Sequence, residues 1–342
     1  MKHNVFVKSM SFMAAAVMAV TLAGCGDDSS SSSAQSKQLV RISSNQIESH
    51  PDVRALKVFE QEVEKKLGDK FDIQIYPNAT LGANEKVLEL IKQGSVQFLV
   101  LSTANIETFD PLYSLFSIPY VFTSEEIYEK YISDPETIKK LNVNEAKNGF
   151  STMVAFTAGT RNFYSIDPIR SVEDMKGKKI RVQASPTNVA MLEALGAAAT
   201  PMAYGDVYSA LQQHVIDGAE NAESTLTDMK HGEVCKYFSY DMHQMSPDML
   251  VGSYKFLQTL TPEERKVFDE AAEAARVEEF KLWHEHTKIA IDKAKKELGV
   301  EFITVNVDEF REKVLPLHQV IMEKNPVIKP MYEEIVKLQQ GN

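Results

Sequence analysis

An arginine within a predicted β-strand is the side chain of this sequence best suited to binding chemistry. The segment KKIRVQ, residues 178–183, alternates so that Ile180 and Val182 face one side of the strand and Arg181 faces the other. Helical patterns before and after it predict a mostly parallel α/β sheet, whose two faces are normally both covered. A buried guanidinium keeps its charge, so Arg181 requires an anionic partner. If no acidic side chain of the protein serves, that partner is a ligand.

The start of the chain has the composition of an export signal. Cationic residues precede an apolar run from Phe12 to Leu22, which is short for a transmembrane helix. The tetrapeptide LAGC resembles a bacterial lipobox, which implies that residues 1–24 are removed and that Cys25 is lipidated. An ordinary signal peptide with an unrelated cysteine is the alternative. Residues 25–37 are rich in serine and predict a structureless tether. We expect an extracytoplasmic protein, lipid-anchored at the periplasmic or outer face of the cell membrane.

Composition narrows the class further. With Cys25 lipidated, only Cys235 remains, so an intramolecular disulfide is impossible and the chain must rely on its own core. The net charge of -11 argues against nucleic acid as a partner, because phosphate binding needs a basic surface. Any anion site would be a local positive region in a negative protein.

Strand patterns alternate with helix patterns after the tether and predict an α/β fold. The first series has strand patterns at 39–43, 71–76 and 96–101, with helices between them. The second has strand patterns at 153–156, 179–183 and 215–219, a helix from Ser185-Pro186 to Gly196, and a helix at 207–214. A capping box at 261–264 begins a long helix to about residue 297, followed by a β segment at 301–307 and helices at 308–324 and 328–339. Two α/β lobes predict a cleft between them, where small ligands usually bind.

Catalytic motifs are absent from the sequence. It contains no glycine-rich phosphate loop, no HExxH, no GxSxG and no CxxC. The HEH segment at 284–286 is interpreted as a solvated helix face, because residues two apart diverge on a helix. We therefore expect neither an enzyme nor a metal or cofactor site.

Several motifs occur in one order along the chain: YPNATLG at 76–82, IPYVF at 118–122, KGKKIRV at 176–182, ALGA at 194–197, YSALQ at 208–212 and IDGAEN at 216–221. In this order they resemble the substrate-binding proteins of tripartite ATP-independent periplasmic (TRAP) transporters, the DctP family. The resemblance extends from about residue 38 to the C-terminal helices.

The resemblance implies a two-lobed periplasmic binding protein fold, type II-like, crossed by a long helix. Lobe I is expected to comprise residues 38–157 and 247–286, and lobe II residues 158–246 and 287–342, including the C-terminal helices. Such proteins enclose an organic acid by hinge closure and deliver it to membrane permease subunits that are driven by a sodium gradient.

Three residues match ligand contacts of the family. Arg181 matches the arginine that clamps the ligand carboxylate, and a planar guanidinium suits both carboxylate oxygens. Arg161 matches a second ligand-facing arginine, and Asn221 an asparagine that touches the carboxylate. The alternatives are a structural ion pair for Arg181, a surface loop position for Arg161 and a turn-forming side chain for Asn221.

Further candidates lie around the cleft. Asn45, His50 and Ser102 are predicted at the carboxyl edge of the first sheet, where ligands bind in α/β folds. Tyr204 can pack an aromatic face against the ligand or belong to the core, and Asp248 can accept hydrogen bonds from ligand hydroxyls.

Glu220 is expected to support the site or to accept hydrogen bonds from sugar hydroxyls, because a carboxylate repels an anionic ligand. The polar candidates suit a hydroxyl-rich acid, and the segments QASPT at 183–187 and GAEN at 218–221 resemble family members associated with hexuronates. D-Glucuronate or D-galacturonate is therefore the expected ligand. The alternatives are a C4-dicarboxylate or another sugar acid such as sialic acid, a ligand-sensing lipoprotein of a signalling system, and an extracytoplasmic enzyme on the same scaffold.

Overall fold

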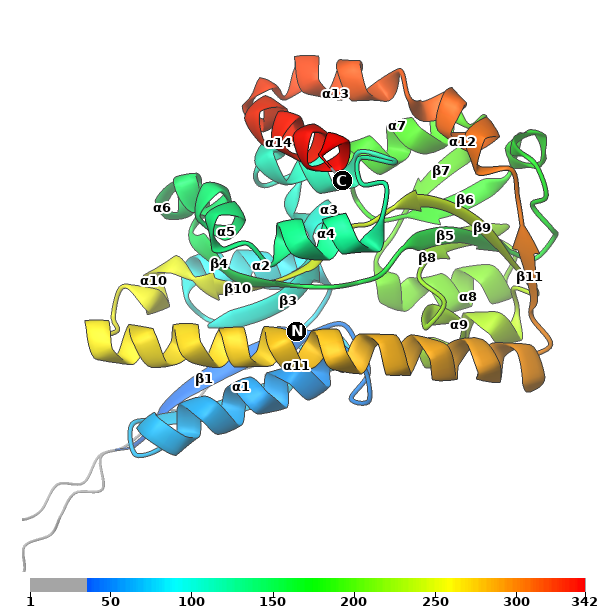
Figure 1. Ribbon diagram of the computed structural model, residues 1–342. Helices are drawn as coiled ribbons and strands as arrows, with labels where there is room; N and C mark the ends of the chain where they lie inside the picture. Colours follow the sequence, from blue (N-terminus) through cyan, green and yellow to red (C-terminus); the bar gives the residue numbers. More distant parts are fainter. Residues whose placement is uncertain (1–35, 342) are drawn as a thin grey trace, which may run out of the picture. The chain divides into compact units, whose positions relative to one another are not determined.

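The computed structural model describes residues 36–341, which fold around two β-sheets (Figure 1). The predicted signal peptide, the lipidation site at Cys25 and nearly all of the tether lie outside the described residues. Within the described range, no helix is both long and apolar enough to cross a membrane.

The first sheet has the strand order β2-β1-β3-β10-β4. Its strands are β1 (Gln38–Ser44), β2 (Phe71–Tyr76), β3 (Phe98–Ser102), β4 (Phe150–Phe156) and β10 (Asp248–Ser253). Strand β1 pairs in parallel with β2 and β3, whereas β10 runs antiparallel to β3 and β4. This sheet and the elements packed on it form lobe I.

The second sheet has the order β11-β9-β5-β8-β6-β7. Its strands are β5 (Arg161–Ser165), β6 (Lys179–Val182), β7 (Ala198–Pro201), β8 (Gly218–Asn221), β9 (Tyr237–Gln244) and β11 (Glu301–Thr304). Strand β6 pairs in parallel with β7 and β8, while β5 runs antiparallel to β8 and β9. Arg181 therefore lies on an inner strand of the sheet of lobe II.

Helices cover both sheets. Most are short and amphipathic: α1 (Pro51–Leu67), α2 (Asn84–Gln93), α3 (Thr103–Ile106), α4 (Glu125–Ile132), α5 (Pro135–Leu141), α6 (Glu145–Asn148), α7 (Pro186–Ala194), α8 (Val207–Gln212), α9 (Thr225–Asp228), α10 (Tyr254–Leu257), α12 (Val307–Val314), α13 (Leu317–Lys324) and α14 (Lys329–Gln340). Helix α7 begins at the cap that the sequence predicted. Ser185 accepts a hydrogen bond from the Asn188 amide and Pro186 occupies the first turn.

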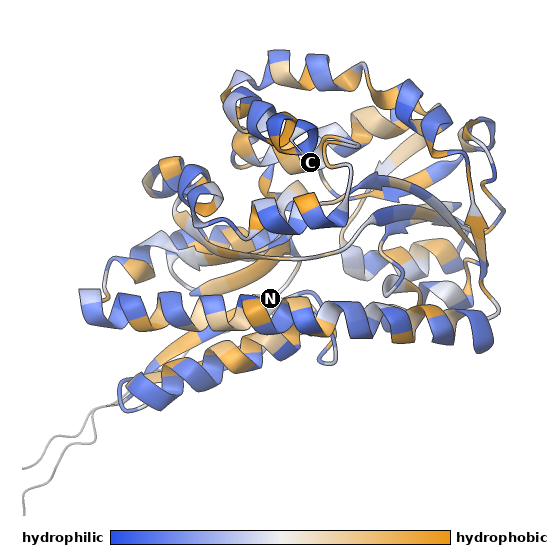
Figure 2. Ribbon diagram, in the orientation of Figure 1, coloured by the Kyte–Doolittle hydropathy of each residue, from blue (hydrophilic) through white to orange (hydrophobic). Residues whose placement is uncertain are grey.

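The long helix α11 (Pro262–Lys296) joins the two lobes. Its capping box forms as predicted, with Thr261 and Glu264 each accepting a hydrogen bond from the other's backbone amide. The helix contacts α1 and β4 of lobe I and α9 of lobe II, and in Figure 1 it extends across the width of the molecule from one lobe to the other. Alanines on the lobe I half of α11 are buried, and in Figure 2 apolar residues alternate with polar ones along the helix. The chain crosses between the sheets in two other places, at residues 157–160 and 245–247.

The predicted α/β class and the long helix joining both lobes are confirmed. The sheets are less parallel than expected, because β4, β5, β9 and β10 belong to the connections between the lobes and pair antiparallel. The strand predicted at 215–219 begins only at Gly218. The helix predicted at 308–324 is two helices, which are separated at Pro316.

The C-terminal helices differ from the expected domain division. Residues 287–342 were assigned to lobe II as a whole, and α12 does pack there through Phe310 and Val314. By contrast, Ile321 of α13 and Ile335 of α14 belong to the hydrophobic cluster of lobe I. After α12 the chain therefore packs partly on lobe I, where the apolar face of α14 is buried, while α13 also contacts α7 of lobe II.

Candidate ligand-binding site

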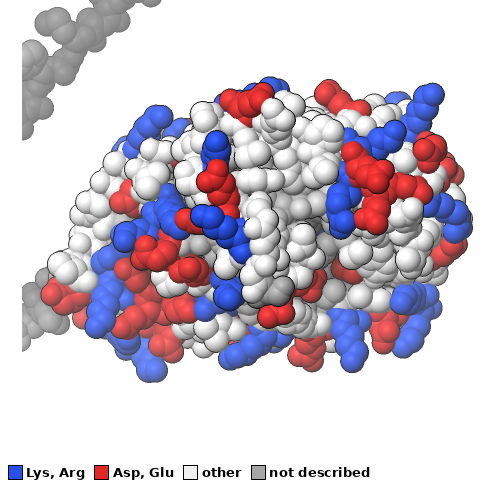
Figure 3. Space-filling model, turned by 45° about the horizontal axis from the view of Figure 1, so that its top comes forward, with Lys and Arg blue, Asp and Glu red and all other residues white. Residues whose placement is uncertain are grey.

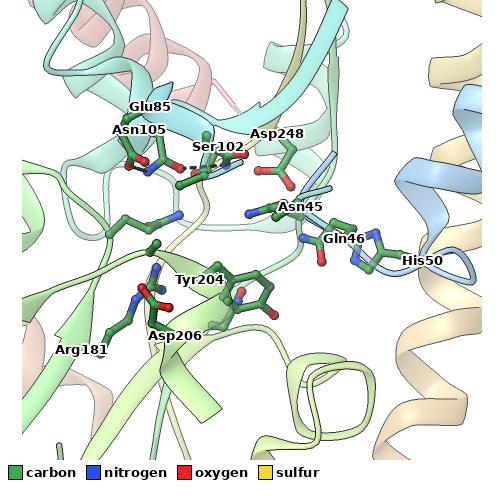
Figure 4. A pocket seen from close by; sticks show the side chains of 18 of the residues that line it. Asn45, Gln46, His50, Glu85, Ser102, Asn105, Arg181, Tyr204, Asp206 and Asp248 are labelled. Carbon is green, nitrogen blue, oxygen red and sulfur yellow. Dashed lines mark hydrogen bonds between the residues drawn. The ribbon is translucent and has the colours of Figure 1, made fainter. Parts of the chain in front are cut away.

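A cavity of about 220 Å³ lies between the two lobes (Figure 4). Both sheets, α11 and the first crossing between the sheets (residues 157–160) contribute to it. The lining residues are Asn45, Gln46, His50, Ala79, Gly82, Ala83, Asn84, Glu85, Ser102, Asn105, Ala158, Arg161, Arg181, Gln183, Ala203, Tyr204, Gly205, Asp206, Asn221, Ser224, Asp248 and Trp283. Several of these residues lie at the carboxyl ends of parallel strands, as expected for a ligand site in an α/β fold.

Arg181 lines this cavity while being only 2% exposed. Its Nε and Nη2 atoms donate hydrogen bonds to the Met202 carbonyl, at 3.1 and 2.8 Å. The guanidinium carbon lies 5.7 Å from the centre of the Tyr204 ring, within the range of a cation–π contact. Among residues 36–341, no acidic side chain forms an ion pair with Arg181. Burial lowers the pKa of Arg181, but an arginine remains charged.

Arg161 has a different environment. It is 3% exposed, and the Glu220 carboxylate accepts hydrogen bonds from its Nε and, at 3.0 Å, from its Nη2. Its Nη1 donates to Asn221 Oδ1 at 3.0 Å. Although burial acts to lower it, the adjacent carboxylate raises the pKa of Arg161. The positive charge of Arg161 is therefore already paired within the protein.

The Glu220 carboxylate lies close to two cationic side chains, Arg161 and His243. Its Oε2 also lies 3.5 Å from Nε2 of His243, whose Nδ1 is 2.8 Å from Asp241 Oδ2. Although burial acts to lower it, the two carboxylates raise the pKa of His243 to about 9. Although burial acts to raise it, Arg161 and His243 lower the pKa of Glu220 to about 2. Arg161, His243, Glu220 and Asp241 thus balance one another, and Arg181 is left as an additional positive charge.

The opposite side of the cavity is formed by lobe I. Asp248, the first residue of β10, is paired in register with Ser102 of β3. Burial, together with the nearby Asp52 carboxylate, raises the pKa of Asp248 to about 8. At neutral pH this side chain is largely protonated and can donate as well as accept a hydrogen bond. His50 caps α1 by accepting from the Asp52 amide at 3.3 Å.

The structure brings together every predicted ligand contact except Glu220. Arg181, Arg161, Asn221, Asn45, His50, Ser102, Tyr204 and Asp248 all line the cavity. Glu220 is fully buried behind Arg161 and does not line it. This position agrees with the expected supporting role of Glu220 rather than with the alternative of hydrogen bonds to sugar hydroxyls, because its carboxylate is occupied by Arg161 and His243.

Sequence reasoning missed other lining residues. Gln46, Glu85, Asn105, Gln183, Asp206 and Trp283 all contribute to the cavity. Glu85 Oε1 accepts a hydrogen bond from Asn105 Nδ2 at 2.6 Å, and Figure 4 shows these two side chains on the lobe I side, with Asp206 near Arg181 on the other. Of these residues, only Gln183 could have been predicted from the sequence, because the alternation in residues 178–183 places it on the same face as Arg181.

The fold and the cavity define a two-lobed binding protein for a small anion. The profile of bacterial extracellular solute-binding protein family 7, DctP, matches residues 42–325. The chain therefore belongs to this family and is a TRAP periplasmic solute-binding protein, not an enzyme. Membership implies permease partners.

Individual relatives agree with this identification. The chain is 37% identical over 291 residues to the uncharacterized protein YiiZ of Salmonella typhimurium, covering 84% of this chain and 88% of that protein. A TRAP solute-binding protein of Anaerococcus prevotii, solved with bound D-glucuronate, is 44% identical with a TM-score of 0.87, covering 89% of this chain and 99% of the other. A Xanthobacter autotrophicus protein, solved with β-D-galacturonate, is 31% identical with a TM-score of 0.83, covering 86% and 98%.

Proposed function

We propose that this protein captures a hexuronate, D-glucuronate or D-galacturonate, by binding its carboxylate at Arg181. The observation that carries the proposal is a buried, charged arginine that lines the interlobe cavity without a carboxylate partner among the described residues. A planar guanidinium suits a carboxylate, which would replace the lost hydration of the arginine. Asn221 lies beside it and can donate from its amide nitrogen, since its Oδ1 is already occupied by Arg161 and the Ala222 amide.

The remainder of the cavity supports a ligand rich in hydroxyl groups. Its polar lining consists mainly of amides and carboxyls, among them Asn45, Gln46, Gln183, Glu85 and Asp206. Such side chains accept and donate hydrogen bonds in the patterns that sugar hydroxyls offer. The relatives that were solved with D-glucuronate and D-galacturonate support the same class.

A C4-dicarboxylate fits this cavity less well. Its second carboxylate would need another cation, yet the charge of Arg161 is taken by Glu220. The ionisable residues on the lobe I side of the cavity, away from Arg181, include Glu85, which would repel a second negative charge. A monocarboxylate with hydroxyl groups avoids this cost.

The proposal includes a transport cycle, which family membership supports. Closure of the lobes about the two crossings and α11 would enclose the ligand, and the loaded protein would deliver it to sodium-coupled permease subunits. Lipidation at Cys25 would hold the protein at the membrane near that permease.

Arg181→Met tests the carboxylate site. Removing one partner of a buried charge pair costs about 2–5 kcal/mol, so D-glucuronate should bind about 30-fold or more weakly. Isothermal titration of the purified protein with uronates, aldonates, C4-dicarboxylates and sialic acid measures the affinity for each class.

The matched control is Arg170→Ala, which removes an exposed arginine of lobe II that pairs with Glu301. It should leave the affinity unchanged within about twofold. Unchanged uronate affinity in Arg181→Met would refute the assigned carboxylate site, whereas tight binding of a dicarboxylate alone would refute the ligand class.

A further inference from the structure

A second cavity, of about 380 Å³, lies beside the ligand cavity along α11. Its lining comes from both lobes and from the first crossing, and includes Glu125, Thr160, Glu223, Tyr240 and Lys288. Trp283 is the one residue, within the part of the chain that the structure describes, that lines both cavities. Its indole therefore stands between them.

The indole is held on several sides. It is 6% exposed and packs against Ala158 of the first crossing and Ala222 of lobe II. It meets the His50 ring of lobe I edge-on, with the ring centres 5.8 Å apart. A methyl group on Gly159 would come within 2.9 Å of the indole Cζ2 and Nε1 atoms, and Gly159 has a φ of +60°. Glycine at this position lets the crossing pass close to the ring, so Trp283 forms a fixed partition.

This partition lies away from the carboxylate site. In Figure 4, Arg181 and His50 lie at opposite sides of the pocket, and His50 adjoins α11. A sugar acid with its carboxylate on Arg181 directs the far edge of its ring, which carries the C1 and C2 hydroxyls, away from lobe II towards His50 and Trp283. A substituent on that edge would meet the indole.

We infer that Trp283 is a specificity-determining residue that restricts the ligand to a single sugar-acid ring. The inference rests on the proposed function, because it takes the carboxylate to be bound at Arg181. Without the indole, the two cavities would join, and the hydroxyl, carboxylate and aromatic groups of the second cavity would suit a neutral sugar linked to the acid.

The experiment compares two probes, D-glucuronate and a disaccharide in which β-D-glucuronate is linked through C1 to a neutral hexose. Isothermal titration of the whole purified protein gives the ratio of their affinities. The native protein should prefer the free acid by more than about tenfold, because a packed wall cannot admit the added ring. In Trp283→Ala that ratio should fall at least tenfold, mainly through tighter binding of the disaccharide.

Trp283→Phe provides a second variant if the alanine variant does not fold. Its smaller ring should lower the ratio by an intermediate amount while circular dichroism remains native. An unchanged ratio in a folded variant, or a native protein that binds the disaccharide as tightly as the free acid, overturns the inference alone. A native protein that binds neither these probes nor D-galacturonate but binds another acid overturns the proposed function, and the inference with it.

Discussion

At the scale of single residues, the two arginines of the cavity have opposite electrostatic situations. Arg161 is neutralised by Glu220, whereas Arg181 contacts a carbonyl and an aromatic ring and has no carboxylate partner among residues 36–341. A buried charge without a partner costs stability, and binding sites often retain such groups for function. We therefore expect the uncompensated charge of Arg181 to lower the stability of the ligand-free protein and to favour the binding of an anion.

The contrast between Arg161 and Arg181 predicts that substitutions at the two sites affect the free energy of unfolding differently. Glu220→Gln should lower the free energy of unfolding by about 3–5 kcal/mol, because it leaves Arg161 and His243 without their shared carboxylate. Arg181→Met should leave the stability of the ligand-free protein unchanged or higher. Urea denaturation of both variants measures the difference, and a large loss of stability in Arg181→Met would contradict this view of the site.

Asp248 predicts a pH dependence of stability. Its pKa is raised from 3.8 to about 8 by burial and by Asp52, so folding favours its protonated form. That contribution is fully present below pH 3.8 and is lost as the pH rises through about 8. His50, whose pKa is also raised, acts in the same direction. The melting temperature of the ligand-free protein should therefore fall between pH 6 and pH 9.

Asp248→Asn is the matched variant, since it keeps the shape of the side chain but does not ionise. Its melting temperature should decline less over the same pH interval. Equal slopes for the native protein and Asp248→Asn would exclude Asp248 as a source of the effect.

At the scale of elements, a carboxylate of lobe I caps a helix of lobe II. Glu107, which follows α3, accepts hydrogen bonds from Ser185 Oγ at 2.5 Å, from Thr187 Oγ1 at 2.7 Å and from the Thr187 amide at 3.2 Å. These bonds, at the start of α7, hold the two lobes together across the cleft. The N-terminal end of a helix favours a negative charge, which strengthens the contact.

Removing this contact should weaken ligand binding without touching the ligand. Hydrogen bonds to a charged group contribute about 1.5–3 kcal/mol, so Glu107→Ala should raise the Kd about tenfold. Small-angle X-ray scattering at intermediate concentrations of D-glucuronate should then show a larger radius of gyration for the variant than for the native protein. Glu193→Ala, an exposed acidic residue near the other end of α7, is the control, and equal Kd values for both variants would refute the role of Glu107.

Local sequence signals predicted the helices that begin with a recognisable N-terminal cap. The caps at Ser185 and Thr261 each depend on residues three positions apart, so the segment itself specifies where α7 and α11 begin. Strands β5, β9 and β10 had no such signal and were not predicted. These segments form strands because they pair antiparallel with distant parts of the chain. Their own sequences show no regular alternation of polar and apolar residues.

At the scale of the whole molecule, a protein of negative net charge contains a buried arginine, Arg181, in the cavity between its lobes. In the view of Figure 3, basic and acidic side chains are interspersed over the surface and do not form a broad basic area. The full chain carries a net charge of -11. In the proposed function, recognition of an anion therefore depends on a buried charge between the lobes, where the surrounding dielectric is low, and not on a positively charged outer face.

The sequence by itself determined the class of this protein: an α/β chain with family motifs, a capped long helix and an arginine placed by alternation on a covered strand. These features follow from neighbouring residues. Only the tertiary structure decided that Glu220 pairs with Arg161 and does not line the cavity, that Trp283 does line it, and that α14 packs against lobe I. Each of these depends on contacts between segments far apart in the chain, and local patterns do not encode which distant charge or apolar face a side chain will meet.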